Sequence, residues 1–216
     1  MGRFQTIFFD FDGTLGDTEP DIRQAWRNTL AKHSLDDDLF KHVFRVGPSL
    51  HETSKLLFPD AAGEFRHVIE ETYKSFYDDA ETYDAIPYPG ITDAVKRLAA
   101  DGVKMFVVTN KRLKPLRKLV AKFGLNEYCT GLFTPDIFDP EHPFSKPELV
   151  KLALRVANPP CPADVLIVGD TEIDILSGKA SGLSTCGVTW GYGSREVISG
   201  ADPDFIIDNA ASIPEL

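Results

Sequence analysis

The sequence predicts an α/β fold: a doubly wound, Rossmann-like parallel sheet that carries an inserted bundle of α-helices. Two observations predict the sheet. Short apolar runs end in polar or glycine-containing turns, and helical patterns lie between these runs. The insertion is predicted by the segment 16–86, which shows helical periodicity and no convincing strand. A chain of 216 residues is long for one domain and short for two, which agrees with one core plus an insertion.

The expected strands and helices of the core follow from these patterns. Five apolar runs are expected to form buried parallel strands: Thr6 to Phe9, Val103 to Val108, Val165 to Val168, Thr185 to Thr189 and Phe205 to Ile207. A short run from Gly131 to Thr134, soon followed by a proline-rich turn, is expected to add a sixth strand. Apolar spacing predicts helices from Ile91 to Ala99 and from Leu113 to Phe123, the second ending at Gly124.

The segment 16–86 interrupts this alternation of strand and helix. Turn-rich sequence marks a hinge at its entry, Gly16 to Pro20, and at its exit, Ile86 to Gly90. Shorter helices are expected around 39–44 and 50–57. We therefore expect a Rossmann-like core of residues 1–15 and 87–216 and a helical insertion of residues 16–86. Its two main helices are predicted from apolar faces, one with Ile22, Ala25, Trp26, Thr29 and Leu30, the other with Phe65, Val68, Ile69, Thr72, Tyr73 and Phe76.

Charge and cysteine usage narrow the classes of partner and compartment. The formal net charge of −10 opposes binding to nucleic acid or to an anionic membrane, because a phosphate surface needs clustered Lys and Arg. No apolar run approaches the roughly 20 residues of a membrane span. The three cysteines form no CxxC pair, which favours free thiols in a reducing compartment. We expect a cytoplasmic monomer or homodimer.

Polar residues follow several of the predicted strands, where an open parallel sheet binds its ligands. Four such places stand out: Asp10 to Thr14, Thr109 to Lys111, Ser145 to Pro147, and Gly169 to Asp174. Each alone has an ordinary structural explanation, such as a turn, a helix cap or a solvated helix start. Their order and their places after strands favour a shared site.

These residue types suit phosphoryl transfer to a carboxylate. When Asp10 attacks a phosphate ester, two anions meet, which costs about 4 kcal/mol at about 4 Å and an effective dielectric constant of about 20. Two carboxylates, from Asp10 and Asp170, plus a main-chain carbonyl can hold Mg²⁺ to offset this cost. Lys146 adds a fixed positive charge, and the Thr109 hydroxyl and nearby N–H groups can bind the phosphoryl oxygens.

Two further aspartates are expected to have different roles. Gly13 permits a sharp turn that brings Asp12 to the leaving-group oxygen, and a neighbouring carboxylate disfavours ionisation of Asp12, so Asp12 is the expected general acid. Asp174 is expected to orient a metal-bound water or the lysine; alternatively, it is a first-turn carboxylate that the helix dipole stabilises.

The four motifs together resemble those of the haloacid dehalogenase superfamily, and they cover nearly the whole chain in the family's order. Motif one is Asp10 to Leu15, motif two Thr109, motif three Lys146, and motif four Asp170 with Asp174. The insertion resembles the family's C1 cap, and the second motif-one aspartate, Asp12, argues against the dehalogenases and phosphonate hydrolases. Ile86 to Gly90 and Gly187 to Tyr192 look most like the phosphoglycolate phosphatase branch.

This resemblance implies a Mg²⁺-dependent phosphatase that hydrolyses a small phosphorylated metabolite through an aspartyl phosphate. It implies the following site: catalytic Asp10, Asp12, Thr109 and Lys146; metal-binding Asp10, Asp12, Asp170 and Asp174; substrate-binding Gly13, Thr14, Asn110 and Arg45. Arg45 belongs to Arg45 to Ser49, which resembles the cap loop that reaches the active site, and it is either an anion binder or an ordinary solvated arginine.

Alternative functions remain open at this point. A β-phosphoglucomutase-like phosphotransferase, an inorganic pyrophosphatase and a nucleotidase of the same superfamily share every motif. From other classes, a receiver module of two-component signalling would not need the insertion, and a silent regulatory binder should show a gap in one motif. The sequence leaves open the physiological substrate, the motion of the cap, and the roles of Lys111 and the Trp190 to Ser194 loop.

Overall fold

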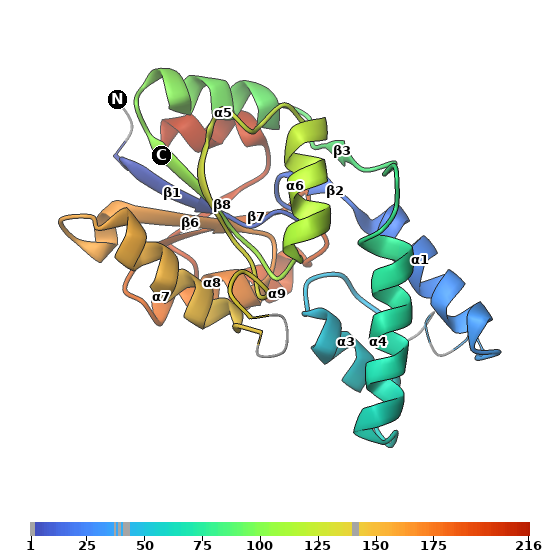
Figure 1. Ribbon diagram of the computed structural model, residues 1–216. Coiled ribbons are helices and arrows are strands. Elements are labelled where there is room, and N and C mark those ends of the chain that lie inside the picture. The colour runs from blue at the N-terminus through green and yellow to red at the C-terminus, as the bar shows by residue number, and fades with distance from the viewer. Residues whose placement is uncertain (1–2, 37, 39, 41–43, 140–142) are drawn as a thin grey trace.

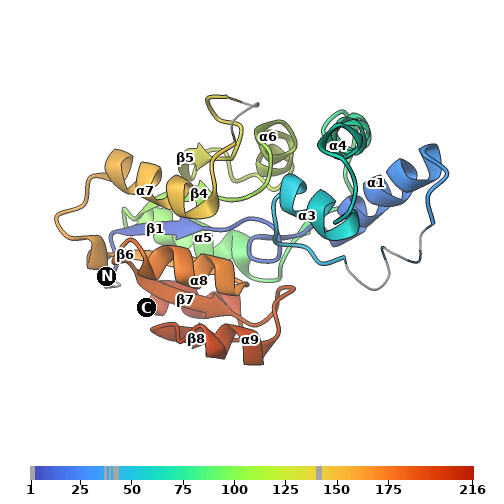
Figure 2. The same ribbon diagram turned by 90° about the horizontal axis from the view of Figure 1, so that it is seen from below.

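The fold is a six-stranded parallel sheet with helices on both faces and a group of helices beside it (Figures 1 and 2). The computed structural model describes residues 3–36, 38, 40, 44–139 and 143–216. Within these residues the strand order is β5-β4-β1-β6-β7-β8, and every neighbouring pair is parallel. The predicted doubly wound α/β fold is confirmed.

The sheet strands lie close to their predicted positions. Their bounds are β1 Thr6–Phe9, β4 Lys104–Val108, β5 Cys129–Phe133, β6 Val165–Gly169, β7 Ser184–Val188 and β8 Phe205–Ile207. The helices of the core are α5 Ile91–Ala100, α6 Leu113–Lys122, α7 Lys146–Ala157, α8 Glu172–Lys179 and α9 Arg195–Gly200, with 3-10 helices η1 Pro162–Asp164 and η2 Ala210–Glu215. Helix α6 is followed by Gly124 at a φ of 67°, as its stop signal predicts.

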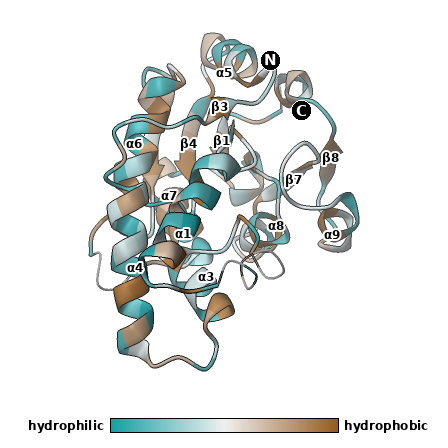
Figure 3. Ribbon diagram, turned by 90° about the vertical axis from the view of Figure 1, so that its right-hand side faces the viewer, coloured by the Kyte–Doolittle hydropathy of each residue, from teal (hydrophilic) through white to brown (hydrophobic). Residues whose placement is uncertain are grey.

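Alternating side chains of the central strands fill two hydrophobic layers. Ile7 and Phe9 of β1 belong to the cluster on the α5 and α6 side, whereas Phe8 belongs to the cluster on the α7 side. Strand β4 shows the same alternation, and Figure 3 colours it as hydrophobic. Because successive side chains of a strand point to opposite faces, a continuous apolar run is what a sheet covered on both faces requires.

The helical insertion leaves and rejoins the core through a short antiparallel ribbon. Strand β2, Gly16–Asp17, pairs with β3, Ile86–Pro87. These two-residue strands were not predicted, because they are too short to show a hydrophobic period. Asp21, in the first helix of the insertion, accepts hydrogen bonds of 2.8 Å from the N–H groups of Asp84 and Ala85, so the entry and the exit are tied together.

Between the two ribbon strands lie α1 Glu19–Lys32, α3 Leu50–Leu57 and α4 Gly63–Tyr77. The predicted apolar face of α1 is buried, and its Trp26 ring lies 4.7 Å from the ring of Tyr73 on α4. The predicted face of α4 is wrong at two positions: Phe65 is 37% exposed and Val68 is 50% exposed, while Tyr77 is buried instead. The helix expected around 39–44 lies largely outside the described residues.

The insertion's helices lie to the side of the sheet in both views (Figures 1 and 2). This arrangement is the one expected of an inserted cap, and the division into residues 1–15 with 87–216 and residues 16–86 stays a prediction. Among the described residues, no helix is both long and apolar enough to cross a membrane.

The chain that returns from α4 to the core, residues 78–83, is fastened to α6 by basic side chains. Arg112 Nε donates to Asp78 Oδ2 at 2.6 Å, and Lys118 Nζ donates to the carbonyl oxygens of Asp78 at 3.2 Å and Ala80 at 2.6 Å. Lys122 Nζ donates to the carbonyl oxygen of Tyr83. The C-terminal end of α4 is therefore held to the sheet domain along most of the length of α6.

Candidate active site

The four sequence motifs meet at the carboxyl edge of the sheet. Asp10 follows β1, Thr109 follows β4, Asp170 follows β6, and Lys146 is the first residue of α7. The Lys146 ammonium lies 2.6 Å from Asp10 Oδ1 and 2.8 Å from Asp174 Oδ1. These five side chains are all buried: Asp10, Thr109, Lys146, Asp170 and Asp174. The strand order therefore brings the separate motifs into one buried site.

The carboxylates of Asp10, Asp170 and Asp174 lie close together. Ligand oxygens of Asp10, Asp170 and Asp174 lie within 4.8 Å of one another. Burial raises the pKa of Asp10 to about 6, with Lys146 opposing that rise and Asp174 adding to it. Burial, and then the charges of Asp10 and Asp174, raise the pKa of Asp170 well above its usual range. Burial alone would lower the pKa of Lys146, but the Asp10 and Asp174 carboxylates raise it overall.

The cluster fits a hard divalent cation. Three carboxylates face the single ammonium of Lys146, so in their ionised forms the group carries a net charge of −2. Oxygen donors of this kind suit Mg²⁺. A cation of charge +2 would complete the neutralisation that the lysine begins, and it would oppose the rise in the pKa of Asp10 and Asp170.

Asp170 is held by residues of motif one. Thr14 Oγ1 donates to Asp170 Oδ1 at 3.1 Å, and Gly13 adopts a φ of 81°, which favours glycine. A Cβ atom on Gly13 would lie 2.1 Å from Asp170 Oδ2, so no larger residue fits there without displacing the carboxylate. Gly13 and Thr14 thus contact the proposed metal site, and their predicted contact with substrate stays a prediction.

Asp174 contacts both the lysine and the start of its own helix. Its Oδ1 pairs with Lys146, and its Oδ2 accepts from the Thr171 backbone N–H at 3.1 Å and from the Thr171 hydroxyl at 2.7 Å. Thr171 and Asp174 form a capping box at the start of α8. The same carboxylate therefore pairs with the lysine and caps the helix, and its predicted roles as an orienting group and a metal ligand stay predictions.

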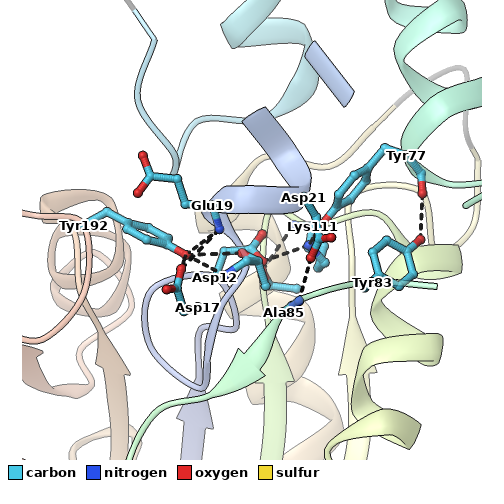
Figure 4. Close-up of polar contacts among 11 residues, drawn as sticks. Asp12, Asp17, Glu19, Asp21, Tyr77, Tyr83, Ala85, Lys111 and Tyr192 are labelled. Atoms are coloured by element: carbon cyan, nitrogen blue, oxygen red, sulfur yellow. Dashed lines mark hydrogen bonds and ion pairs between the residues drawn. The ribbon is translucent and has the colours of Figure 1, made fainter. Parts of the chain in front are cut away.

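Asp12 is not part of this cluster and is held by a different set of donors. Its Oδ1 accepts from Thr18 Oγ1 at 2.6 Å and from Lys111 Nζ at 2.8 Å (Figure 4). Lys111 Nζ also donates to the hydroxyl of Tyr77 at 2.5 Å, which joins α4 to the core. Because the Asp12 carboxylate lies outside the three-carboxylate cluster, its predicted role as a metal ligand stays a prediction.

Lys111 and Tyr77 were not assigned from sequence. The motif Thr109 to Lys111 placed Lys111 near the sheet edge, but a lysine directly after a strand is common on protein surfaces. Lys111 is only 5% exposed. The apolar run before Lys111 is a signal that could have identified it as buried, since the first residues after a buried strand are often buried as well.

Residues of the second motif make hydrogen bonds both within the core and to the insertion. Thr109 donates its N–H to the Phe133 carbonyl, and its hydroxyl accepts from the Lys111 N–H at 3.2 Å. Asn110 Nδ2 donates to the carbonyl oxygen of Gly47 at 3.0 Å. Asn110 thus ties the loop 45–48 of the insertion to the core, and its predicted contact with substrate stays a prediction.

A small cavity lies between the loop 45–48 and the sheet edge. Its volume is about 70 Å³, and Asp10, Asp12, Thr109 and Arg45 are among the residues that line it. At roughly 10–15 Å³ for each water, such a cavity holds about five waters. Arg45 is exposed at this cavity and makes no hydrogen bond or ion pair with any described residue.

The fold and the clustered side chains are those of an α/β protein with a candidate active site at the carboxyl edge of the sheet. The model of the haloacid dehalogenase-like hydrolase family matches residues 4–182. The chain belongs to this family, so the resemblance stated from the motifs is confirmed, and the alternative of a receiver module is set aside.

The chain is similar to named relatives over nearly its whole length. It is 30% identical to the pyrophosphatase PpaX of Anoxybacillus flavithermus over 211 residues, which are 96% of this chain and 94% of that protein. It is also 30% identical to the phosphoglycolate phosphatase of Vibrio vulnificus over 217 residues, covering 96% of this chain and 93% of that protein. Relatives of both names resemble it equally.

Solved structures show the same fold. A protein described as a predicted phosphatase from Clostridium acetobutylicum superposes with a TM-score of 0.86 at 23% identity, covering 98% of this chain and 97% of that chain. CbbY from Rhodobacter sphaeroides, solved in complex with phosphate, gives a TM-score of 0.77 at 22% identity, covering 97% and 96%. At these identities the likeness supports the fold alone.

Proposed function

We propose that this chain is a Mg²⁺-dependent phosphatase that hydrolyses a small phosphate monoester through an aspartyl phosphate on Asp10. The observation that carries the proposal is the Lys146 ammonium, 2.6 Å from Asp10 Oδ1 within a cluster of three buried carboxylates. A carboxylate positioned by a buried cation is suited to attack an anionic ester, because the charge that opposes the approach is already offset.

In the first step, the Asp10 carboxylate attacks phosphorus and the bond from phosphorus to the leaving oxygen breaks. Asp12 gives a proton to that oxygen, so the alcohol leaves neutral. In the second step, water attacks the aspartyl phosphate while Asp12 takes a proton from it. The bond from phosphorus to Asp10 breaks, inorganic phosphate leaves, and both carboxyl groups return to their first state.

The other residues of the site hold the phosphoryl group and its charge. Lys146 stays between Asp10 and Asp174, and the Thr109 hydroxyl is placed to donate to a phosphoryl oxygen at the cavity. Bound Mg²⁺ supplies further positive charge, and Asp10, Asp170 and Asp174 are the side chains that would hold it. The loop 45–48 lines the same cavity as Asp10 and Thr109.

The small cavity and the two sets of relatives point to compact substrates. A phosphorylated carboxylate such as phosphoglycolate, a small sugar phosphate or pyrophosphate carries a second group near the reacting phosphate. Pyrophosphatase activity remains the second candidate, because the pyrophosphatase PpaX relative is as similar as the phosphoglycolate phosphatase relative.

A substrate panel tests the proposed function. Phosphate release is measured from phosphoglycolate, sugar phosphates, nucleotides and pyrophosphate, with Mg²⁺ or with a chelator. We expect release from at least one compact monoester, lost when the metal is chelated. Release that persists in chelator would contradict the mechanism. Glucose 1-phosphate with a trace of its bisphosphate separates the mutase, which accumulates glucose 6-phosphate, from the phosphatase, which gives free phosphate.

Arg45 is proposed as the residue that recognises a second anionic group. Arg45→Ala is expected to raise KM for a phosphorylated carboxylate by about 10-fold or more, as for loss of a charged hydrogen bond, and to leave KM for a neutral phosphate ester within about twofold. Steady-state kinetics with both substrates measure this difference. Arg27→Ala, in α1, is a control because Arg27 does not line the cavity. Equal effects on both substrates would refute the assignment.

A further inference from the structure

The loop after β7, Trp190 to Gly193, lies outside the matched family segment 4–182 and has no assigned role. It crosses from β7 over the end of β6 to the motif-one loop after β1. Trp190 Nε1 donates to the Thr14 carbonyl oxygen at 3.1 Å, and the Tyr192 N–H donates to Asp170 Oδ2 at 2.8 Å. The loop therefore contacts both Asp170 and the segment that follows the proposed nucleophile.

Glycines on both sides of Tyr192 allow this close approach. A Cβ atom on Gly191 would lie 2.3 Å from Asp170 Cβ and 2.3 Å from the Gly13 carbonyl oxygen. A Cβ atom on Gly193 would lie 2.0 Å from the Asp170 carbonyl oxygen. Real Cβ atoms do not approach backbone this closely, so the spacing Gly-Tyr-Gly is what lets Tyr192 reach across Asp170.

The Tyr192 side chain continues to the start of the helical insertion. Its hydroxyl accepts from the N–H groups of Thr18 at 2.7 Å and Glu19 at 2.9 Å, and it donates to Asp17 Oδ1 at 3.0 Å (Figure 4). Burial raises the pKa of the Tyr192 phenol, so the hydroxyl keeps the proton that it donates. The beginning of α1 is thus held by a side chain distant in sequence.

Thr18, whose backbone N–H donates to the Tyr192 hydroxyl, contacts Asp12 through its own hydroxyl. Thr18 is the N-cap residue of α1, and such a threonine usually accepts a hydrogen bond from its own helix. Here its side chain makes no cap hydrogen bond and instead donates to Asp12 Oδ1 at 2.6 Å. The Tyr192 hydroxyl accepts from the N–H groups of Thr18 and Glu19, which precede those that a capping side chain binds. Within the described residues, Asp12 Oδ2 makes no hydrogen bond, so Oδ1 is the oxygen that fixes the carboxylate.

We infer that Tyr192 is a positioning residue that links Asp170 and the start of the helical insertion to Asp12, through Thr18, and so sets the direction from which Asp12 serves the leaving group. The inference rests on the proposed function, because it gives Asp12 the role of acid. Among the described residues, the hydrogen bonds of Tyr192 go to Asp17, Thr18, Glu19 and Asp170, and none goes to Asp10 or Asp12.

The dependence of rate on the leaving group tests this inference. Tyr192→Phe removes the hydroxyl and keeps both the ring and the backbone N–H that binds Asp170. We expect kcat/KM, which reports the first step, to fall about 10- to 100-fold for an alkyl phosphate, whose leaving group needs a proton, and less than about threefold for p-nitrophenyl phosphate. Affinity for Mg²⁺, measured by calorimetry, should change by less than about twofold, since the backbone contact to Asp170 remains.

Two further variants separate positioning from a loss of stability. Thr18→Val removes the Asp12 contact directly, and the double variant with Tyr192→Phe should be no slower on the alkyl phosphate than the slower single variant. Tyr83→Phe removes another buried tyrosine hydroxyl, which donates to the Tyr77 carbonyl oxygen at 2.7 Å, and should leave the ratio of the two rates unchanged.

The possible outcomes are distinct. Two results would overturn the role of Tyr192 while the wild-type chain still releases phosphate. One is that Tyr192→Phe leaves the ratio of the rates on the alkyl phosphate and p-nitrophenyl phosphate unchanged. The other is that the effects of Thr18→Val and Tyr192→Phe are additive. A wild-type chain that releases phosphate from neither substrate would overturn the proposed function instead. A lower melting temperature of Tyr192→Phe without a changed ratio would show that the hydroxyl serves stability alone.

Discussion

Replacing Asp10 by asparagine is expected to lower kcat for phosphate release by about 10⁴-fold or more, because the amide cannot act as the nucleophile. The shape of the side chain is kept, and its oxygen can still accept from Lys146. Steady-state release of phosphate measures the loss, and acid-quenched protein from labelled substrate should carry label on the wild-type chain and none on Asp10→Asn.

Two comparisons make this result specific. Asp93→Asn, at an exposed position in the first turn of α5, should keep activity within about twofold. The melting temperature of Asp10→Asn in chelator should be equal to or above that of the wild-type chain, because a crowded buried charge is removed. If Asp10→Asn retained more than about one tenth of the wild-type rate, Asp10 would not be the nucleophile.

Bound Mg²⁺ is expected to stabilise the folded chain strongly, and more so as pH rises. At about 100 times the dissociation constant, a ligand adds about 2.7 kcal/mol, which corresponds to roughly 5–10 °C in Tm for a chain of this size. The pKa of Asp10 rises from 3.8 to about 6 on folding without metal. A raised carboxyl pKa gives stability that is present below the unfolded value and lost as pH passes through the folded one.

The metal-free chain should therefore lose stability between about pH 4 and pH 6, and the gain from Mg²⁺ should be larger at about pH 7.5 than at about pH 5. Thermal unfolding with Mg²⁺ or chelator at both pH values measures this difference. Asp170→Asn should abolish most of the gain and, in chelator at about pH 7.5, should raise Tm above that of the wild-type chain. A gain from Mg²⁺ that is the same in Asp170→Asn would place the metal elsewhere.

Much of the fold was predictable because strands and helices carry local signals. The runs at Thr6 to Phe9 and Phe205 to Ile207 match β1 and β8 residue for residue. Strand β1 is buried throughout, whereas the edge strand β8 is half-buried. The meeting of Asp10, Lys146 and Asp174 was predictable because the carboxyl ends of parallel strands share one edge of the sheet.

What was missed depends on contacts between distant parts of the chain. Neither the pairing of Lys111 with Asp12 nor the reach of Tyr192 to Thr18 leaves a periodic pattern, because each joins loops from separate elements. The exposed Val68 shows a related limit: an apolar residue at helical spacing is buried only if a neighbouring element covers it.

The basic side chains of α6 that bind residues 78–83 matter for building chimaeras with relatives. A natural place to exchange the helical insertion is the end of α4 at Tyr77. A cut there keeps the native return segment, whereas a graft that runs on to the β2–β3 ribbon sets a foreign segment against Arg112, Lys118 and Lys122, whose partners are Asp78, Ala80 and Tyr83. Since two of these three contacts are to main-chain oxygens, the path of the segment matters more than its side chains. Grafts joined within the β2–β3 ribbon should therefore carry α6 from the same parent as residues 78–83.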